Sequence, residues 1–290
     1  MQSSTKKDLS TLVDDVYDTV CDINKGEVSI PENLLGELIS GITKAVQGWA
    51  APTSRDKFTL RMSNIGKPTR QLYYQKKLEG TGVDAFNAPT LIKFLYGHIL
   101  EEVLIFLVKL SGHTVSDLQK EIVVDGIKGH MDCKIDGEVI DIKTASNFAF
   151  RKFKFGTLSE DDPFGYLPQL AGYETAEGTE NGGFFAINKE SGELALYQPE
   201  ELDKPNVNLL ISKIINILEE EQVPEKCYAP VPLGTKGNMK LPIGCVYCNF
   251  KKECYKDSND GQGLRMFKYA KGLEFLTEVK SIPKVEEVFE

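Results

Sequence analysis

The 290-residue chain contains no apolar run long enough to span a membrane. Its first residues, Met1 to Leu9, also lack the apolar stretch of a secretory signal. We therefore expect a cytoplasmic protein with no membrane partner. Thiols stay reduced in that compartment, so the six cysteines are interpreted as free thiols or metal ligands rather than as a disulfide framework.

The chain also lacks a net positive charge. Lys and Arg number 34 against 43 Asp and Glu, which gives a formal net charge of −9. This balance argues against non-specific coating of DNA, so any nucleic-acid role must depend on local basic patches or metal ions. With no internal repeat, 41% hydrophobic residues and 27% charged residues, the composition is that of a globular protein. The length allows one large domain or two of ordinary size.

Hydrophobic periodicity predicts helices interspersed with strands, which is an α/β pattern. One expected helix, residues 90–111, is apolar almost all the way round and should be buried, yet it carries His98, Glu101 and Glu102. A buried carboxylate is costly unless it is paired or bound to a cation. The other expected elements are amphipathic helices over 8–24 and 32–49, a strand over 121–124, a hairpin within 129–146, a helix over 164–176, two strands within 183–199 and a helix over 206–222.

Residues 55–77 form a basic stretch with seven Lys or Arg residues, the single acid Asp56, and Tyr73 and Tyr74 among them. Basic groups interleaved with aromatic rings suit a strand of nucleic acid, because cations contact phosphates and rings stack under bases. The alternative is the solvated basic face of an ordinary helix.

Asp136-Gly137 lies between two alternating segments and predicts a two-residue hairpin loop. If these two residues form the loop, Asp132 lies opposite Asp141, and His130 lies opposite Lys143. The other face of the hairpin is then apolar and should be core; it receives Met131, Cys133, Ile135, Ile140 and Ile142.

Two opposed aspartates repel each other, and a common reason for a fold to keep them is a divalent cation between them. Oxygen ligands in a partly hydrated site select magnesium or manganese. Lys143 shares the face of Asp141 because strands repeat every two residues. A metal, two carboxylates and a lysine are suitable parts for cutting a phosphodiester, since the lysine can orient a water or stabilise developing charge. The alternative is a surface hairpin whose charged residues face water.

Gln169 and Tyr173 are four residues apart in PQLAGYE and share one face of the expected helix. An amide and a phenol at this spacing can contact a phosphate or a base. Taken alone, the pair is equally compatible with an ordinary helix surface.

These motifs, in this order, resemble the PD-(D/E)xK nuclease superfamily, and in particular its RecB-type exonuclease branch, which includes CRISPR-associated and phage-encoded exonucleases. The resemblance covers roughly residues 60–255. It is carried by GHILE (Gly97 to Glu101), GHMD (Gly129 to Asp132), DIK (Asp141 to Lys143) and QLAGY (Gln169 to Tyr173).

The resemblance implies a restriction-endonuclease-like core, in which a mixed central sheet is flanked by helices, and it assigns roles to individual residues. Glu101, Asp132 and Asp141 resemble the ligands of one or two Mg²⁺ or Mn²⁺ ions, with the backbone carbonyl of Ile142 as a further ligand and Lys143 as the catalytic lysine. His98 is an additional candidate ligand, although a core or supporting histidine is the favoured interpretation. The residues expected to contact DNA are Lys67, Arg70, Tyr73, Gln169 and Tyr173.

Three cysteines, Cys245, Cys248 and Cys254, stand in CVYCNFKKEC, and a CxxC pair in a reduced compartment indicates a metal site. The spacing resembles the C-terminal triplet of the iron–sulfur RecB-type nucleases. Those relatives take their fourth thiolate from an N-terminal C-P-R-like segment, whereas the comparable stretch here, KPTRQLYY, has no cysteine. We therefore expect Cys227 to be the fourth ligand.

Four thiolates suit either a [4Fe–4S] cluster, which the resemblance favours, or zinc. In both cases the expected role is structural, with Lys251 and Lys252 near enough to contact phosphate. Cys21 and Cys133 are interpreted as buried thiols without a metal.

Together these features predict an N-terminal helical region (1–54), a nuclease core (55–205) and a C-terminal helix and cysteine segment (206–290). The expected function is that of a metal-dependent DNA exonuclease acting on single-stranded or linear ends in recombination, repair or phage DNA metabolism. A helicase or recombinase partner, and a phage origin that would place the protein in the host cytoplasm, are both compatible with the sequence. The alternatives are a catalytically silent DNA-binding module of the same fold and a restriction-type endonuclease. Polarity, strand preference and oligomeric state are not predicted.

Overall fold

The computed structural model describes residues 7–51, 57–81 and 86–289. It divides into two compact units, which we call the sheet unit (1–54, 60–66 and 86–212) and the cysteine unit (55–59, 67–85 and 213–290). This division differs from the three segments expected from the sequence. The N-terminal helices belong with the sheet, and residues 67–85 belong with the C-terminal part of the chain. Arg55 and Asp56 of the basic stretch lie outside the described residues.

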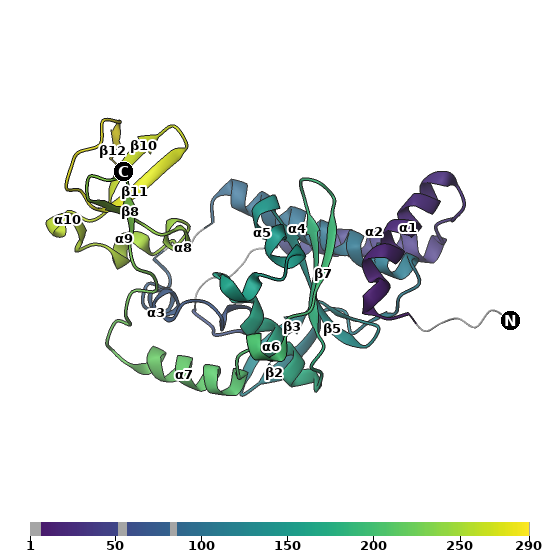
Figure 1. Ribbon diagram of the computed structural model, residues 1–290. Helices are drawn as coiled ribbons and strands as arrows, with labels where there is room; N and C mark the ends of the chain where they lie inside the picture. The colour runs from purple at the N-terminus through teal and green to yellow at the C-terminus, as the bar shows by residue number, and fades with distance from the viewer. Residues whose placement is uncertain (1–6, 52–56, 82–85, 290) are drawn as a thin grey trace. The chain divides into compact units, whose positions relative to one another are not determined.

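A mixed five-stranded sheet organises the sheet unit, in the order β1-β4-β5-β6-β7. Two of its strands, β5 and β7, are labelled in Figure 1. Strands β5 and β6 run parallel, and the other neighbouring pairs in this sheet are antiparallel. Strands β2 and β3 form a separate antiparallel hairpin. The bounds are β1 (Val115–Ser116), β2 (Lys120–Val124), β3 (Ile127–Met131), β4 (Cys133–Ile135), β5 (Glu138–Ala145), β6 (Gly183–Asn188) and β7 (Leu194–Tyr197).

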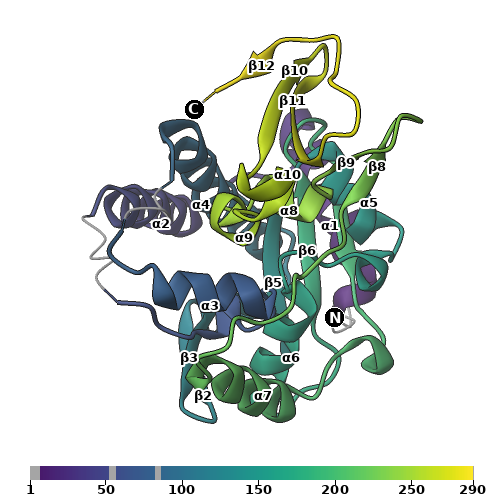
Figure 2. The ribbon, with the colours of Figure 1, turned by 90° about the vertical axis from the view of Figure 1, so that its left-hand side faces the viewer.

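Helices cover both faces of this sheet. On one face, α1 and α4 pack their apolar side chains against alternate residues of β4, β5 and β6 in a continuous core. On the other face, α5 and α6 lie against β5. Helix α2 runs beside α4, as both views show (Figures 1 and 2). The bounds are α1 (Leu12–Lys25), α2 (Glu32–Ala50), α4 (Ala88–Leu110), α5 (Asn147–Lys154) and α6 (Tyr166–Glu177), with 3-10 turns at Leu9–Thr11, Met62–Asn64, Leu158–Glu160 and Glu201–Asp203.

The alternation of side chains along β5 decides what each face receives. Ile140 and Ile142 join the core under α4, so Asp141 and Lys143 point to the face that α5 and α6 cover. The expected helices over 8–24, 32–49, 90–111 and 164–176 are confirmed to within a few residues. Helix α5 was not predicted.

The predicted register of the β4–β5 hairpin is confirmed. Ile135 pairs with Glu138, and Cys133 pairs with Ile140. The apolar face is also confirmed as core, because each of its members is at most 6% exposed: Met131, Cys133, Ile135, Ile140 and Ile142.

The prediction that His130 lies opposite Lys143 is wrong. The chain leaves the central sheet at Asp132, and the preceding strand β3 pairs with β2 instead, so that His130 lies opposite Glu121. His130 is 58% exposed as a result. The cause is a competing partner for β3, which the two-residue loop by itself does not reveal.

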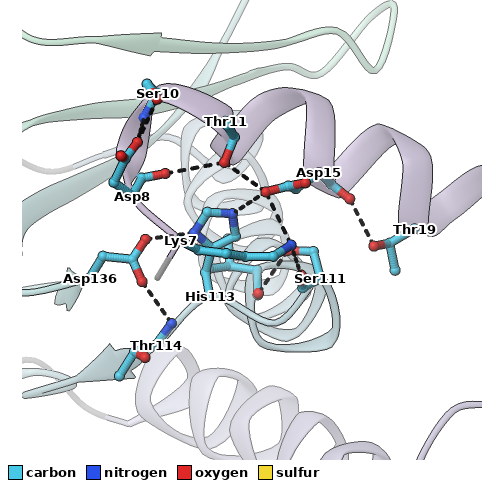
Figure 3. Close-up of polar contacts among 11 residues, drawn as sticks. Lys7, Asp8, Ser10, Thr11, Asp15, Thr19, Ser111, His113, Thr114 and Asp136 are labelled. Carbon is cyan, nitrogen blue, oxygen red and sulfur yellow. Dashed lines mark hydrogen bonds and ion pairs between the residues drawn. The ribbon is translucent and has the colours of Figure 1, made fainter. Parts of the chain in front are cut away.

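A buried histidine ties helix α1 to the β4–β5 turn (Figure 3). The Nδ1 atom of His113 lies 2.6 Å from a carboxylate oxygen of Asp136, and its Nε2 atom lies 3.0 Å from a carboxylate oxygen of Asp15. Lys7 pairs with the same Asp15 oxygen at 3.1 Å. The two ring nitrogens thus contact carboxylates from two segments that are far apart in the sequence.

The cysteine unit contains an antiparallel sheet in the order β12-β10-β11-β9-β8, in which β10 and β11 form a long hairpin (Figure 2). Helix α7 (Val207–Glu219) begins in the sheet unit and ends in this one. The sequence predicted α7 but not the sheet. The remaining bounds are α3 (Thr69–Lys77), β8 (Val231–Leu233), β9 (Asn238–Lys240), α8 (Ile243–Val246), α9 (Lys251–Cys254), α10 (Ser258–Gly261), β10 (Arg265–Tyr269), β11 (Gly272–Glu278) and β12 (Glu287–Val288). Across the described part of the chain, no helix combines the length and apolarity needed to cross a membrane.

Candidate active site and cysteine site

The predicted Asp and Lys of the DIK motif lie together on β5. Asp141 is 1% exposed, and its carboxylate forms an ion pair with the ammonium of Lys143. The same ammonium lies 4.5 Å from the centre of the Tyr166 ring, over its face. Asp132 joins them from the start of β4, where its Oδ2 atom accepts a hydrogen bond of 2.7 Å from the backbone N–H of Ile142. The three charged side chains therefore belong to one site.

Glu101 reaches the same site from helix α4. A side-chain carboxylate oxygen of Glu101 accepts a 2.8 Å hydrogen bond from the amide nitrogen of Gln119, whose backbone N–H donates to the carbonyl oxygen of Asp132 at 2.9 Å. Gln119 thus connects Glu101 to Asp132. Gly97, one turn before Glu101, allows α4 to approach β5, because a Cβ atom there would already touch the Thr144 hydroxyl at 3.4 Å.

Burial and mutual repulsion raise the pKa values of two carboxyl groups at this site. Burial raises the pKa of Glu101 to about 7, and the charges of Glu102 and Asp141 add to the effect. Burial, followed by the charges of Asp141 and Glu101, also raises the pKa of Asp132 well above its ordinary range. Mutually repelling carboxyl groups of this kind are stabilised by a cation between them.

Lys143 is the positive charge in this group. Burial alone lowers the pKa of its ammonium, but the negative charges of Asp141 and Asp132 outweigh burial and raise the pKa above its usual value. The side chain is therefore a cation at neutral pH. The ammonium can stabilise negative charge on a substrate or orient a water molecule. It does not act as a proton acceptor, because it already carries its proton.

The predicted Gln169 and Tyr173 contact each other on α6. The amide nitrogen of Gln169 donates to the Tyr173 hydroxyl at 2.6 Å, and Tyr173 is only 1% exposed. Burial, followed by the charge of Asp141, raises the pKa of this phenol, so it stays protonated. Gly129 and Gly172 make room beside it for Met62, since a Cβ atom on either glycine would lie within 2.5 Å of the methionine side chain.

The structure does not support His98 as a core or supporting histidine, because its side chain is exposed on α4. Within the described residues, no three His, Cys, Asp or Glu side chains are arranged closely enough to hold a metal ion as they stand. Metal binding at Glu101, Asp132 and Asp141 therefore remains a prediction, for which the donor chemistry and the mutual repulsion are suitable.

The four predicted cysteine ligands line one small cavity in the cysteine unit. Its volume is about 30 Å³, and residues from the start of α3 complete its wall. The lining cysteines are Cys227, Cys245, Cys248 and Cys254, and none of them is in a disulfide.

Three of these sulfur atoms have a hydrogen-bond donor beside them. The Nε atom of Arg70 lies 3.0 Å from the Cys254 sulfur. The other donors are the backbone N–H groups of Arg70 and Gln71 at Cys227 and the backbone N–H of Phe250 at Cys248. Donors of this kind stabilise the negative charge of thiolate ligands.

In the absence of a metal, three of the thiols, Cys227, Cys245 and Cys248, remain protonated at neutral pH. Burial raises the pKa of Cys245 to about 11, and the neighbouring sulfurs add to the effect against the Tyr255 hydroxyl. Burial likewise raises the pKa values of Cys227 and Cys248. A metal ion would reverse this preference, because it binds the thiolate form.

Three residues expected to contact DNA have other partners here. Tyr73 is 6% exposed, and its hydroxyl donates to the carbonyl oxygen of Glu221 at 2.9 Å. The guanidinium of Arg70 contacts the Cys254 sulfur and donates to the Pro224 carbonyl oxygen. Contact of these residues with DNA stays a prediction. Burial lowers the pKa of Lys67, against the opposing influence of Cys248. All three lie in the cysteine unit.

The other two cysteines are unlike each other. Cys133 is buried as predicted, and its thiol lies 3.7 Å from the Ile140 carbonyl oxygen. Cys21 is exposed on α1, so the prediction that it is buried is wrong. An amphipathic helix places only part of its surface in the core, and Cys21 lies on the outer part.

Sequence reasoning missed Gln119 and Tyr166. Gln119 has a φ of +52°, the left-handed region that disfavours side chains, and it occupies a turn with no sequence signature. Tyr166 lies three residues before Gln169 in the expected helix. This spacing places both side chains on one face of the helix, and it is the sequence feature that could have identified Tyr166. Its contact with Lys143 depends on how α6 packs on β5.

No protein-family model and no curated protein matches the chain. Among solved structures, an alkaline exonuclease (LHK-Exo) from Laribacter hongkongensis is 17% identical, covers 60% of this chain and 92% of that chain, and gives a TM-score of 0.39. A phage-related exonuclease from Haemophilus somnus 129PT is 15% identical over 56% of this chain and 91% of that chain, with a TM-score of 0.38. The protein SSO0001 is 17% identical over 77% and 95%, with a TM-score of 0.37. The fold resemblance to these proteins is distant, and none of it bears on the chemistry of the site.

Proposed function

We propose that the protein is a metal-dependent DNA exonuclease. The observation that carries the proposal is the gathering of Glu101, Asp132 and Asp141 around the ammonium of Lys143 in one buried site. Folding removes these charged groups from water, which is unfavourable. A protein without a catalytic or binding function would have no reason to keep this unfavourable arrangement. The same residues occupy the matching positions of the nuclease motifs.

One or two Mg²⁺ or Mn²⁺ ions would be held by the three carboxylates and the backbone carbonyl of Ile142. A bound ion supplies a Lewis acid for the phosphoryl oxygen and lowers the pKa of a water that it holds. Oxygen donors without sulfur or imidazole suit these two metals. The proposal requires a small rotation of the side chains toward the ion.

Lys143 supplies the positive charge. Its ammonium is held between Asp141 and the Tyr166 ring, so it has little freedom to move. In that position it stabilises the extra negative charge that a phosphodiester gains as water attacks. Gln169, fixed by Tyr173, is the polar group of α6 that we assign to the substrate strand.

The cysteine site is proposed to hold a metal with a structural role. Spacing and resemblance favour a [4Fe–4S] cluster, and zinc is the alternative that four thiolates also suit. In either case four thiolates join α3 to the segment that carries Cys227 and to the C-terminal knuckle, which stabilises the cysteine unit.

The test uses end-labelled single-stranded and double-stranded linear DNA beside closed circles, each with Mg²⁺ or Mn²⁺. An exonuclease degrades the linear strands and leaves the circles intact. Cleavage of circles indicates a restriction-type endonuclease, and silence on every substrate indicates a DNA-binding module. Loss of activity is expected in Asp132→Ala and Lys143→Ala, and activity that survives in either variant rejects the site.

A further inference from the structure

The outer face of helix α5 carries phenylalanines where an amphipathic helix normally carries polar groups. Phe150 and Phe153 point inward and are at most 3% exposed. Phe148 and Phe155, seven residues apart on the opposite side, are 75% and 62% exposed. Hydration of two phenyl rings on one short helix is unfavourable, so the exposed rings indicate a binding surface.

Cations accompany both rings. The guanidinium of Arg151 lies 5.7 Å from the Phe155 ring centre, and the ammonium of Lys152 lies 5.8 Å from the Phe148 ring centre. Each cation lies over its ring, and exposed rings together with cations suit the bases and phosphates of a nucleic-acid strand.

A third exposed ring leads toward the proposed active site. Phe164 is 59% exposed and stacks on Tyr166, with 5.5 Å between the ring centres. Tyr166 in turn lies under the ammonium of Lys143. The buried face of α5 meets the same ring, since Phe153 and Tyr166 are 6.2 Å apart. Phe164 is therefore connected through Tyr166 to Lys143, the residue that we assign to the reaction, and the inner face of α5 packs on the same tyrosine.

The local charges decide which end of this surface takes phosphates. Lys152 is paired with Asp161 at 2.6 Å, and Lys154 is paired with Glu193 at 2.7 Å, so both positive charges are largely compensated. Glu160 is exposed near Phe164 and disfavours a phosphate there. Arg151 is the basic group best placed to contact a phosphate.

We propose that Phe148, Phe155 and Phe164, with Arg151, form a stacking platform for a single-stranded segment of the nucleic-acid substrate. This proposal rests on the proposed nuclease function, and it adds that the substrate is held as an unpaired strand. Duplex DNA hides its base faces, so only an unpaired strand can use exposed rings in this way. The platform therefore selects a single strand or the frayed end of a duplex.

The experiment measures binding of the full-length protein to a 20-nucleotide oligothymidylate and to a strand of the same length made of abasic units, without added divalent metal. Each of Phe148→Ala, Phe155→Ala and Phe164→Ala should weaken binding of the oligothymidylate on the order of tenfold. Affinity for the abasic strand should stay unchanged, because phosphate contacts remain. Phe289→Ala is the matched control, because Phe289 is 84% exposed in the other unit.

Arg151→Gln provides a second, independent measurement. It should reduce the slope of log affinity against log salt by about 0.7, the value for one phosphate contact on a single strand. The affected side chains are exposed, so the melting temperatures of all variants should match the wild type.

Two outcomes overturn the platform. In the first, the wild type degrades DNA but the phenylalanine variants bind the oligothymidylate as tightly as it does; the nuclease proposal then stands without the platform. In the second, the variants lose binding to vesicles of phosphatidylserine and phosphatidylcholine but not to oligothymidylate, which would make the surface a membrane contact. A wild type that cleaves nothing contradicts the proposed function, yet the binding measurements still test the platform.

Discussion

The carboxylate of Asp132 accepts a hydrogen bond from the backbone N–H of Ile142, with 2.7 Å between the two atoms. The backbone pairing between β4 and β5 ends at Cys133 and Ile140. Beyond this pair the N–H of Ile142 has no backbone acceptor on β4, and the side chain of Asp132 accepts its hydrogen bond instead. This bond holds the carboxylate beside Asp141 and explains why the two acids act on each other even though β3 has left the sheet.

The hydrogen bond between Asp132 and Ile142 allows the structural role of Asp132 to be tested separately from its role as a metal ligand. Asp132→Asn keeps an oxygen that can accept the Ile142 N–H but removes the charge. We expect cleavage to fall by roughly a hundredfold or more, because a metal ligand is lost. We expect the melting temperature to be retained or raised, because burial already disfavours the charged form. Asp132→Ala should lose both activity and stability. An equally active Asn variant would show that the charge is not used.

Glu101 should make the stability of the metal-free protein depend on pH. Its pKa rises from 4.5 to about 7 on folding, so the folded state binds more protons than the unfolded state between these values. The free energy of unfolding should therefore decrease as pH rises from about 4.5 to 7, by on the order of 3 kcal/mol for this group alone. Thermal or urea unfolding at several pH values measures the slope.

Glu101→Gln should remove most of that slope and stabilise the metal-free protein at pH 8, while abolishing cleavage. Mn²⁺ should raise the melting temperature of the wild type at pH 8, less so at pH 6, where Glu101 is protonated. The variant should respond weakly at both pH values. If the free energy of unfolding of the wild type does not decrease between pH 4.5 and 7, the carboxyl groups do not repel one another as we infer.

The cysteine site should hold a metal whose identity is visible in the absorption spectrum of anaerobically purified protein. A broad brown band indicates the iron–sulfur cluster, and a colourless protein with one zinc ion indicates the alternative. Binding to the metal-free protein should release protons, because burial keeps Cys227, Cys245 and Cys248 protonated in the absence of metal. Cys245→Ser should lose metal and stability. Cys21→Ser, at an exposed cysteine in the other unit, is the matched control.

The His113 contacts should contribute to stability and not to catalysis. His113→Ala removes the side chain that contacts the mostly buried carboxylate of Asp136, so we expect the free energy of unfolding to fall by about 3 kcal/mol. His130→Ala, at a histidine that is 58% exposed, should change it little. Urea unfolding measures both variants. Equal stability of the two would mean that the His113 ring contributes nothing to holding α1 against the turn.

Several features of the site follow from the sequence alone because they depend on short-range geometry. The Asp136-Gly137 loop sets the pairing of Ile135 with Glu138, and the two-residue period of a strand then places Asp141 and Lys143 on one face. The helix around Glu101 follows from its apolar residues in the same way. The CxxC spacing likewise points to Cys245 and Cys248 as neighbours, since two intervening residues bring their sulfurs together.

Other features were decided only by contacts between distant segments. Strand β3 found a better partner in β2, which moved His130 away from Lys143. Arg70 met Cys254, 184 positions away, so a basic residue that suits DNA by its composition became part of a sulfur site. Local sequence sets which residues share a face, because bond geometry repeats over a few residues. Which faces meet depends on the packing of the whole chain, and this is why Gln119 and Tyr166 became visible only in the folded protein.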